Sequence, residues 1–153
     1  MSKIYILCGY TLSGKTTWSG KQNLKVFNYD SMKYDPNRNG LKMEVFMEQE
    51  VRKYGGDCIL DHTSWSEKSI KRLCETYKDY DITIVIFDIT YDRLLKNRQQ
   101  TDRKIKGLET ITTKERFGWF KEEAEKVKKL PYKQIVITDK DYVDSSPMTD
   151  FLL

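Results

Sequence analysis

The sequence predicts an α/β fold: a mainly parallel five-stranded sheet with helices on both faces. Segments of strand character and segments of helix character alternate five times along the 153 residues, and such alternation favours parallel strands joined by right-handed crossovers. The clearest strand is the β-branched run at 82–87, which we expect to be central and buried. A chain of this length predicts one domain over residues 1–153.

The first strand and the loop after it carry the strongest motif. Residues 3–8 read Lys-Ile-Tyr-Ile-Leu-Cys, an apolar run that predicts a buried strand, and the next nine read Gly-Tyr-Thr-Leu-Ser-Gly-Lys-Thr-Thr. That is Gly-x4-Gly-Lys-Thr, a phosphate-binding loop placed directly after a strand. Its glycines allow backbone N–H groups to approach phosphate oxygens closely. The pattern therefore predicts nucleotide binding by Gly9, Leu12, Ser13, Gly14, Lys15, Thr16 and Thr17.

Two side chains of this loop have specific expected roles. Lys15 is expected to reach the β- and γ-phosphates of ATP, and the Thr16 hydroxyl is expected to ligate Mg²⁺. The alternative is a glycine-rich turn between a strand and a helix, which would require neither side chain.

The first half of the chain continues the alternation. A helix is expected at about 16–23, with Trp18 as a packing residue, and a strand at 24–28. Residues 34–40 contain a proline, two asparagines and a glycine, so they predict a loop. A helix over about 41–54 has apolar residues at helical spacing and is ended by Gly55-Gly56.

The second half repeats the pattern. A strand is expected at 57–61, then a helix opened by the capping box Ser64-x-x-Glu67, with apolar residues at 70, 73, 74 and 77. A helix at about 91–98 follows the strand at 82–87. A second capping box, Thr112-x-x-Glu115, opens the last long helix, which Pro131 ends, and 134–137 predicts the final strand.

Composition narrows the class of protein. The 27 basic and 23 acidic residues leave a net charge of +4, which is compatible with an anionic ligand but too small to demonstrate one. No apolar stretch approaches the ~20 residues of a membrane span, so no membrane partner is expected, and the start of the chain predicts no signal peptide. The three scattered cysteines are typical of buried thiols in a cytoplasmic protein.

Polar residues follow the second and third predicted strands, where open α/β sheets bind ligands. Asp30 and Lys33 follow the second strand, and both are therefore candidates for the site; the alternative for Asp30 is a helix cap. Asp61 ends the third strand and is suited to holding a metal-bound water or a basic side chain. His62 beside it is a candidate general base or a hydrogen-bonding residue of a turn.

The segment 98–108 is polar and basic, with little to bury. It is either a solvated surface loop or a lid whose arginines close over the phosphoryl group during transfer.

Together these segments resemble the phage-type 5′-hydroxyl polynucleotide kinases over residues 3 to about 130. The loop at 9–18 is similar to theirs, and Asn28-Tyr29-Asp30 with Lys33 is similar to their Asn-Arg-Asp-Asp-x-Arg segment. Residues 54–57 and 61–64 resemble their Gly-Gly-Asp and Asp-x-(Thr/Asn) segments, and residues 94–103 resemble the start of their lid. Three features depart from the pattern: lysine at 33 instead of arginine, serine at 31 instead of aspartate, and extra residues between Arg98 and Arg103.

The resemblance implies a P-loop kinase fold with an arginine-bearing lid, and a part in nucleic acid repair. It implies transfer of the ATP γ-phosphate, with Mg²⁺, to the 5′-hydroxyl of a DNA or RNA end. Asp30 would be the general base, and Lys15 and a lid arginine, Arg103 in preference to Arg98, would stabilise the transferred group. Lys33 and Asp61 would face the acceptor.

Two other functions stay open. One is a kinase of the same fold for a nucleoside, nucleotide or sugar, and the other is a nucleotide-gated binding module with slow hydrolysis.

Overall fold

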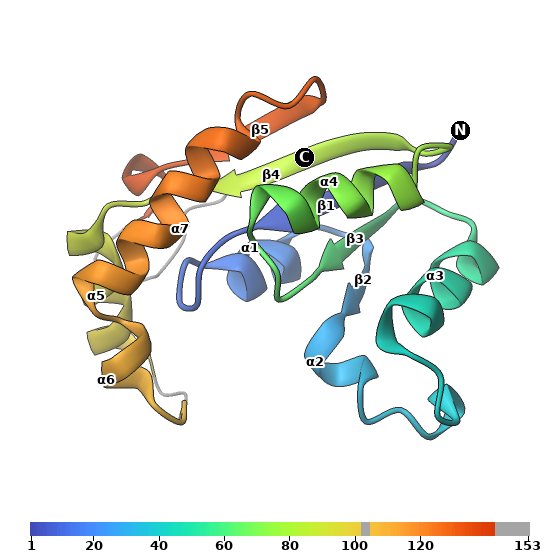
Figure 1. Cartoon of the computed structure of the whole chain (residues 1–153), viewed down its shortest axis with the longest axis horizontal. Helices are drawn as coiled ribbons and strands as arrows, with labels where there is room; N and C mark the ends of the chain where they lie inside the picture. The colour runs from blue at the N-terminus through green and yellow to red at the C-terminus, as the bar shows by residue number, and fades with distance from the viewer. Residues whose placement is uncertain (102–104, 143–153) are drawn as a thin grey trace.

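The computed structural model describes residues 1–101 and 105–142. Five strands form one sheet in the order β2-β3-β1-β4-β5, and every neighbouring pair is parallel (Figure 1). The strands are β1 (Lys3–Cys8), β2 (Lys25–Asn28), β3 (Cys58–Asp61), β4 (Asp81–Phe87) and β5 (Lys133–Ile137). The parallel five-stranded sheet expected from the sequence is confirmed, with β4 between β1 and β5.

Helices fill the connections on both faces of the sheet. They are α1 (Lys15–Lys21), α2 (Tyr29–Met32), α3 (Met43–Tyr54), α4 (Glu67–Thr76), α5 (Tyr91–Gln100), α6 (Leu108–Ile111) and α7 (Lys114–Val127), with 3₁₀ turns at Pro36–Arg38 and Asp139–Asp141. The connection from β1 to β2 crosses the sheet in one direction and the later three cross in the other. Right-handed crossovers therefore put α1 on one face and α3, α4 and α7 on the opposite face. Figure 1 shows α4 lying across β1 and β4.

The core is built from the buried strands and the apolar sides of the helices. β3 is buried along its whole length, and the largest fully buried side chains include Trp18, Tyr77, Phe87 and Phe120. Trp18 of α1 meets Phe87 of β4 edge to face, with ring centroids 6.1 Å apart. The expected packing role of Trp18 is thus confirmed.

Both predicted capping boxes begin at the wrong residue. The N-cap of α4 is Ser66, not Ser64; Ser64 lies in the turn before the helix, where its backbone N–H donates to His62 Nδ1 at 3.0 Å. The N-cap of α7 is Thr113, not Thr112, because the Thr112 hydroxyl donates to the Leu108 carbonyl at 2.6 Å. In each case the true cap accepts a hydrogen bond from the backbone three residues on, as caps do.

The topology places β1 between β3 and β4. The helix after β1 lies on the opposite face from the helices that follow β3 and β4, so the chain diverges above the carboxyl end of β1. Ligands of open α/β sheets bind at such a switch point, and the loop at 9–14 occupies it.

The three cysteines are buried and carry free thiols. Burial raises the pKa of Cys8, which ends β1, to about 12, so this thiol stays protonated near neutral pH. Within the described part of the chain, no helix is long and apolar enough to cross a membrane.

Candidate active site

The loop after β1 has the backbone shape that phosphate binding requires. Leu12 and Gly14 have positive φ angles of 66° and 95°, and alternation of this kind with right-handed residues turns successive N–H groups toward one point. The Ser13 N–H closes a turn on the Tyr10 carbonyl at 3.1 Å. Among the residues that the structure describes, no side chain caps α1, so the loop leaves the start of that helix open.

Gly9 is required by close packing rather than by its backbone angles. A Cβ atom there would lie 2.5 Å from Ser13 Oγ, which is too close, and 3.0 Å from Phe87 Cδ2, which is a tight contact. Ser13 is 1 % exposed, and its hydroxyl has no hydrogen-bond partner among the described residues. A buried hydroxyl without a partner inside a phosphate-binding loop fits an anion ligand, because such groups are otherwise satisfied.

A cavity of about 650 Å³ opens above this loop. It is lined by the whole loop from Gly9 to Thr17 and by residues from three other places: Asn28, Asp30, Asp61, Thr63, Trp65, Asn97, Gln100 and Thr101. The structure therefore brings the predicted phosphate-binding residues together with Asp30 and Asp61 around one space. That space is large enough for a nucleotide-sized ligand.

Asp61 connects the phosphate loop to α2. One carboxylate oxygen lies 3.9 Å from Lys15 Nζ, and the other accepts a hydrogen bond from Asn28 Nδ2 at 3.0 Å. Asn28 in turn accepts from the Ser31 N–H at 3.0 Å, so it is the N-cap of α2. The two ends of one amide thus fix α2 against the end of β3.

Asp30 lies in the first turn of α2 and is exposed. The cap of this helix is Asn28, so the alternative that Asp30 serves as the cap is wrong. An exposed carboxylate that lines the cavity and does no capping is available to a reacting hydroxyl.

Asp88, the third carboxylate at this edge of the sheet, is used differently. It follows β4 and pairs with Lys121 and Lys128 of α7, the latter at 2.6 Å. Burial raises the pKa of Asp88, but the hydrogen bonds from the two lysines outweigh it and leave the pKa below its ordinary value. Asp88 therefore anchors α7 and does not line the cavity.

Helix α5 holds the phosphate loop from outside. Asn97 Nδ2 donates to the Leu12 carbonyl at 2.8 Å, and Asn97 Oδ1 accepts from Arg93 Nε at 3.0 Å. The Arg93 guanidinium lies 4.9 Å from the centre of the Tyr142 ring, and the Tyr142 hydroxyl donates to the Ser13 carbonyl. Arg93, Asn97 and Tyr142 are all buried, so these contacts are shielded from solvent.

Arg98 and Lys33, two further predicted site residues, do not line the cavity. Arg98 donates to Thr112 Oγ1 at 3.2 Å, which ties α5 to the segment before α7. Lys33 is exposed, with its ammonium 5.1 Å from the Tyr34 ring centre. Arg103 lies outside the described residues, so its predicted place in the lid stays a prediction.

His62 is turned away from the phosphate loop. It is 7 % exposed, its ring meets Tyr29 edge to face at 5.0 Å, and its Nδ1 accepts from Ser64. Burial lowers the pKa of His62; Glu44 opposes this shift and Lys15 reinforces it. His62 lines a second cavity, so the geometry favours the turn-forming role over that of a general base in the first.

The fold agrees with that of solved kinases. A chain of "Structure of the Pnkp1/Rnl/Hen1 RNA repair complex" matches with a TM-score of 0.62 and 23% identity. The match covers 86% of this chain and 47% of that one, so this chain spans about half its length. No protein-family model matches the sequence, and a search of curated proteins finds no match.

Two small-molecule kinases match over nearly their whole length. A sugar kinase from Janibacter sp. has a TM-score of 0.55 and 10% identity, covering 90% of this chain and 86% of that one. Deoxyadenosine kinase from M. mycoides with bound dATP has a TM-score of 0.54 and 15% identity, covering 96% and 95%. The fold is that of the P-loop kinases.

Sequence reasoning missed the residues that support the P-loop from other elements. Asn97 and Tyr142 touch the loop's carbonyls, and Asn28 links Asp61 to α2. Of these three residues, only Asn28 could have been identified from the sequence, because a polar residue that ends a buried strand lies at the edge of the sheet where ligands bind. Asn97 and Tyr142 are 85 and 129 residues from their partners, so no local pattern identifies them.

Proposed function

We propose that the protein is an ATP-dependent kinase that transfers the γ-phosphate to the 5′-hydroxyl of a DNA or RNA end. One observation carries the proposal: the P-loop lysine and two carboxylates from neighbouring strand ends line the same cavity of about 650 Å³. A phosphate-holding loop beside an available carboxylate is what phosphoryl transfer to a hydroxyl requires.

In this proposal each group has a defined role. The acceptor oxygen attacks the γ-phosphorus as the bond to the β-phosphate oxygen breaks, so ADP leaves, and Asp30 takes the hydroxyl proton. Lys15 and the loop N–H groups bear the phosphate charge. Mg²⁺, for which the Thr16 hydroxyl is the suited ligand, supplies further charge neutralisation when bound.

The lid and the acceptor side complete the arrangement. Arg103, or Arg98 once released from Thr112, meets charge that develops only during transfer. Lys33 lies in the segment after β2 and would bind a phosphate of the acceptor. Lysine binds phosphate as a point charge, because it lacks the bidentate fork of arginine. Asp61 orients Lys15 and α2 from the end of β3.

The choice of a nucleic-acid end rests on the sequence resemblance and on the likeness to a chain of an RNA repair complex. A second candidate is a kinase for a nucleoside, nucleotide or sugar. It is favoured by the near-complete mutual coverage with a sugar kinase and a deoxyadenosine kinase.

The test is transfer of labelled phosphate from ATP to a panel of acceptors. The panel holds 5′-hydroxyl DNA and RNA oligonucleotides, nucleosides, nucleotides and sugars, each assayed with wild-type protein and with Lys15→Ala. We expect labelled oligonucleotide with the wild type and none with Lys15→Ala, whose position at the start of α1 should leave folding intact. Labelling of small molecules alone would support the second candidate. Slow ATP hydrolysis with no labelled acceptor would contradict both and favour a nucleotide-gated module.

A further inference from the structure

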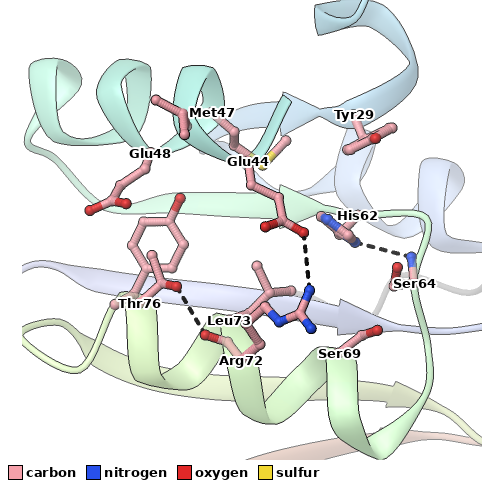
Figure 2. A pocket seen from close by; sticks show the side chains of 12 residues that line it. Tyr29, Glu44, Met47, Glu48, His62, Ser64, Ser69, Arg72, Leu73 and Thr76 are labelled. Atoms are coloured by element: carbon pink, nitrogen blue, oxygen red, sulfur yellow. Dashed lines mark hydrogen bonds and ion pairs between the residues drawn. The ribbon is translucent and has the colours of Figure 1, made fainter. Parts of the chain in front are cut away.

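A second cavity, of about 230 Å³, lies between α3 and α4. In Figure 2, Glu44 of α3 and Arg72 of α4 reach toward each other across it, and Tyr29, His62 and Ser64 stand at one end. That end is the one formed by the carboxyl ends of β2 and β3, where the first cavity also lies.

The two cavities adjoin each other along three segments of the chain. Three residues that line the second cavity are each bonded in sequence to a residue that lines the first. Tyr29, His62 and Ser64 line the second cavity, and their respective neighbours Asp30, Asp61 and Thr63 line the first. A molecule in the second cavity therefore lies next to the segments that carry Asp30 and Asp61. This placement suits a part of the acceptor that does not react.

The lining of the second cavity indicates the chemistry of that part. Met47 and Leu73 supply buried apolar sides. Polar groups face them: Glu44 pairs with Arg72 at 3.5 Å, and both side chains are more than half exposed. An ion pair this exposed is weak, so a ligand can take over either partner.

His62 adds a fixed donor to this lining. Its Nδ1 accepts from Ser64, so in the neutral ring the proton is on Nε2, which has no partner among the described residues. Glu44 and Glu48 against one arginine leave the cavity without excess positive charge, which disfavours a phosphate group. Apolar walls with donors and acceptors at the edge suit a flat, neutral heteroaromatic ring.

We propose that the cavity between α3 and α4 binds the nucleobase of the phosphate acceptor and so directs the acceptor's 5′-hydroxyl toward Asp30. The inference rests on the proposed kinase function and names the acceptor class for that same site. A free nucleoside and the first residue of a 5′-hydroxyl oligonucleotide both present this base, and the experiment below separates them.

The test fills the cavity with a large side chain, introduced at an exposed position where a substitution should not disturb the fold. Val45 lines the cavity from α3 and is 43% exposed, so Val45→Trp places a large ring at its opening. The matched control is Gln49→Trp, an exposed position on the same helix outside the lining. Circular dichroism checks that both variants fold.

The first measurement is calorimetric binding of nucleosides and of short 5′-hydroxyl oligonucleotides in the absence of ATP. We expect wild type and Gln49→Trp to bind either the nucleosides or the oligonucleotides. Val45→Trp should bind the same ligand at least about tenfold more weakly, because a well-made contact is lost. Binding of nucleosides identifies a free nucleoside as the source, and binding of oligonucleotides alone identifies a nucleic-acid end. Absence of binding by the wild type, or equal binding by Val45→Trp, would overturn the proposal.

The second measurement compares transfer to an oligonucleotide with that to the same oligonucleotide lacking only its 5′-terminal base. We expect the abasic acceptor to have a KM at least about tenfold higher with the wild type, and Val45→Trp to abolish this difference. Equal use of both acceptors by the wild type would overturn the base site while leaving the kinase function intact. Base-dependent binding without any transfer would overturn the kinase function while leaving the base site intact.

Discussion

At the residue scale, Asp30 is the side chain on which the enzymatic function depends. It lines the cavity and is not the cap of α2, which is Asn28. A positioned carboxylate that accepts the proton of an attacking hydroxyl contributes typically ~10²–10⁴-fold to the rate. Because asparagine keeps the size of aspartate but cannot accept that proton, Asp30→Asn should lower transfer by about two orders of magnitude or more.

Labelled-phosphate transfer measures the rate of the Asp30→Asn variant, and calorimetry measures its affinity for ATP, which should stay close to that of the wild type. The nearby exposed substitution Ser31→Ala, which retains the backbone N–H bound by Asn28, is the control. Near-normal transfer by Asp30→Asn would direct the search for a base to Asp61.

His62 gives a second test at this scale, since it is the chain's one histidine. Its pKa is lowered by burial in the folded protein, so below its ordinary pKa of ~6.5 the unfolded chain binds a proton that the folded chain does not. Stability should therefore fall as the pH drops from about 7.5 to about 5.5, and the fall should be smaller in His62→Asn, whose amide oxygen can accept from Ser64. Urea unfolding at both pH values measures the difference, and an identical pH dependence of the two proteins would contradict the burial effect.

At the scale of elements, α5 supports the phosphate loop through the hydrogen bond of Asn97 to the Leu12 carbonyl. Asn97→Asp keeps the acceptor for Arg93 but removes the donor to the Leu12 carbonyl. Leaving a partly buried carbonyl without its partner costs up to about 1–3 kcal/mol, and Leu12 holds a φ of 66°. We expect Asn97→Asp to lower the free energy of unfolding by about that amount and to raise the KM for ATP.

The control for that substitution is Gln99→Ala, an exposed position of the same helix. Urea unfolding gives the free energy, and steady-state kinetics gives the KM. An unchanged KM for ATP in Asn97→Asp would mean that the loop keeps its shape without α5.

At the scale of the whole molecule, nucleotide binding should stabilise the fold. The cavity joins residues of the loop after β1, of α1, α2 and α5, and of the ends of β2 and β3, so a ligand in it holds together segments distant in the sequence. At one hundred times its Kd a ligand adds about 2.7 kcal/mol, which raises the Tm of a chain of this size by about 5–10 °C. Thermal unfolding with and without Mg²⁺–ATP measures the shift, and Lys15→Ala should abolish it; no shift with the wild type would contradict nucleotide binding.

The sequence alone determined the fold class and the phosphate loop, because both depend on local patterns. The apolar run of the strand Lys3–Cys8, the spacing of the glycines and the apolar periodicity of the helices are each patterns of a few residues. They can therefore be recognised without tertiary contacts. The sequence did not determine where two helices begin: the caps are Ser66 and Thr113, not the predicted Ser64 and Thr112. Which of several neighbouring hydroxyl residues caps a helix depends on where the packed chain begins that helix: Ser64 lies in a turn with His62, and the Thr112 hydroxyl donates to Leu108.

Only the tertiary structure decided which side chains surround the loop. Parallel strands bring Asn28 and Asp61 into register at one edge, yet Asp88 at the same edge is taken up by two lysines of α7. Asn97 and Tyr142 meet the loop across most of the chain length, and the cavity between α3 and α4 exists only once those helices pack. Such contacts depend on where packed elements place their side chains, and that placement has no local sequence pattern.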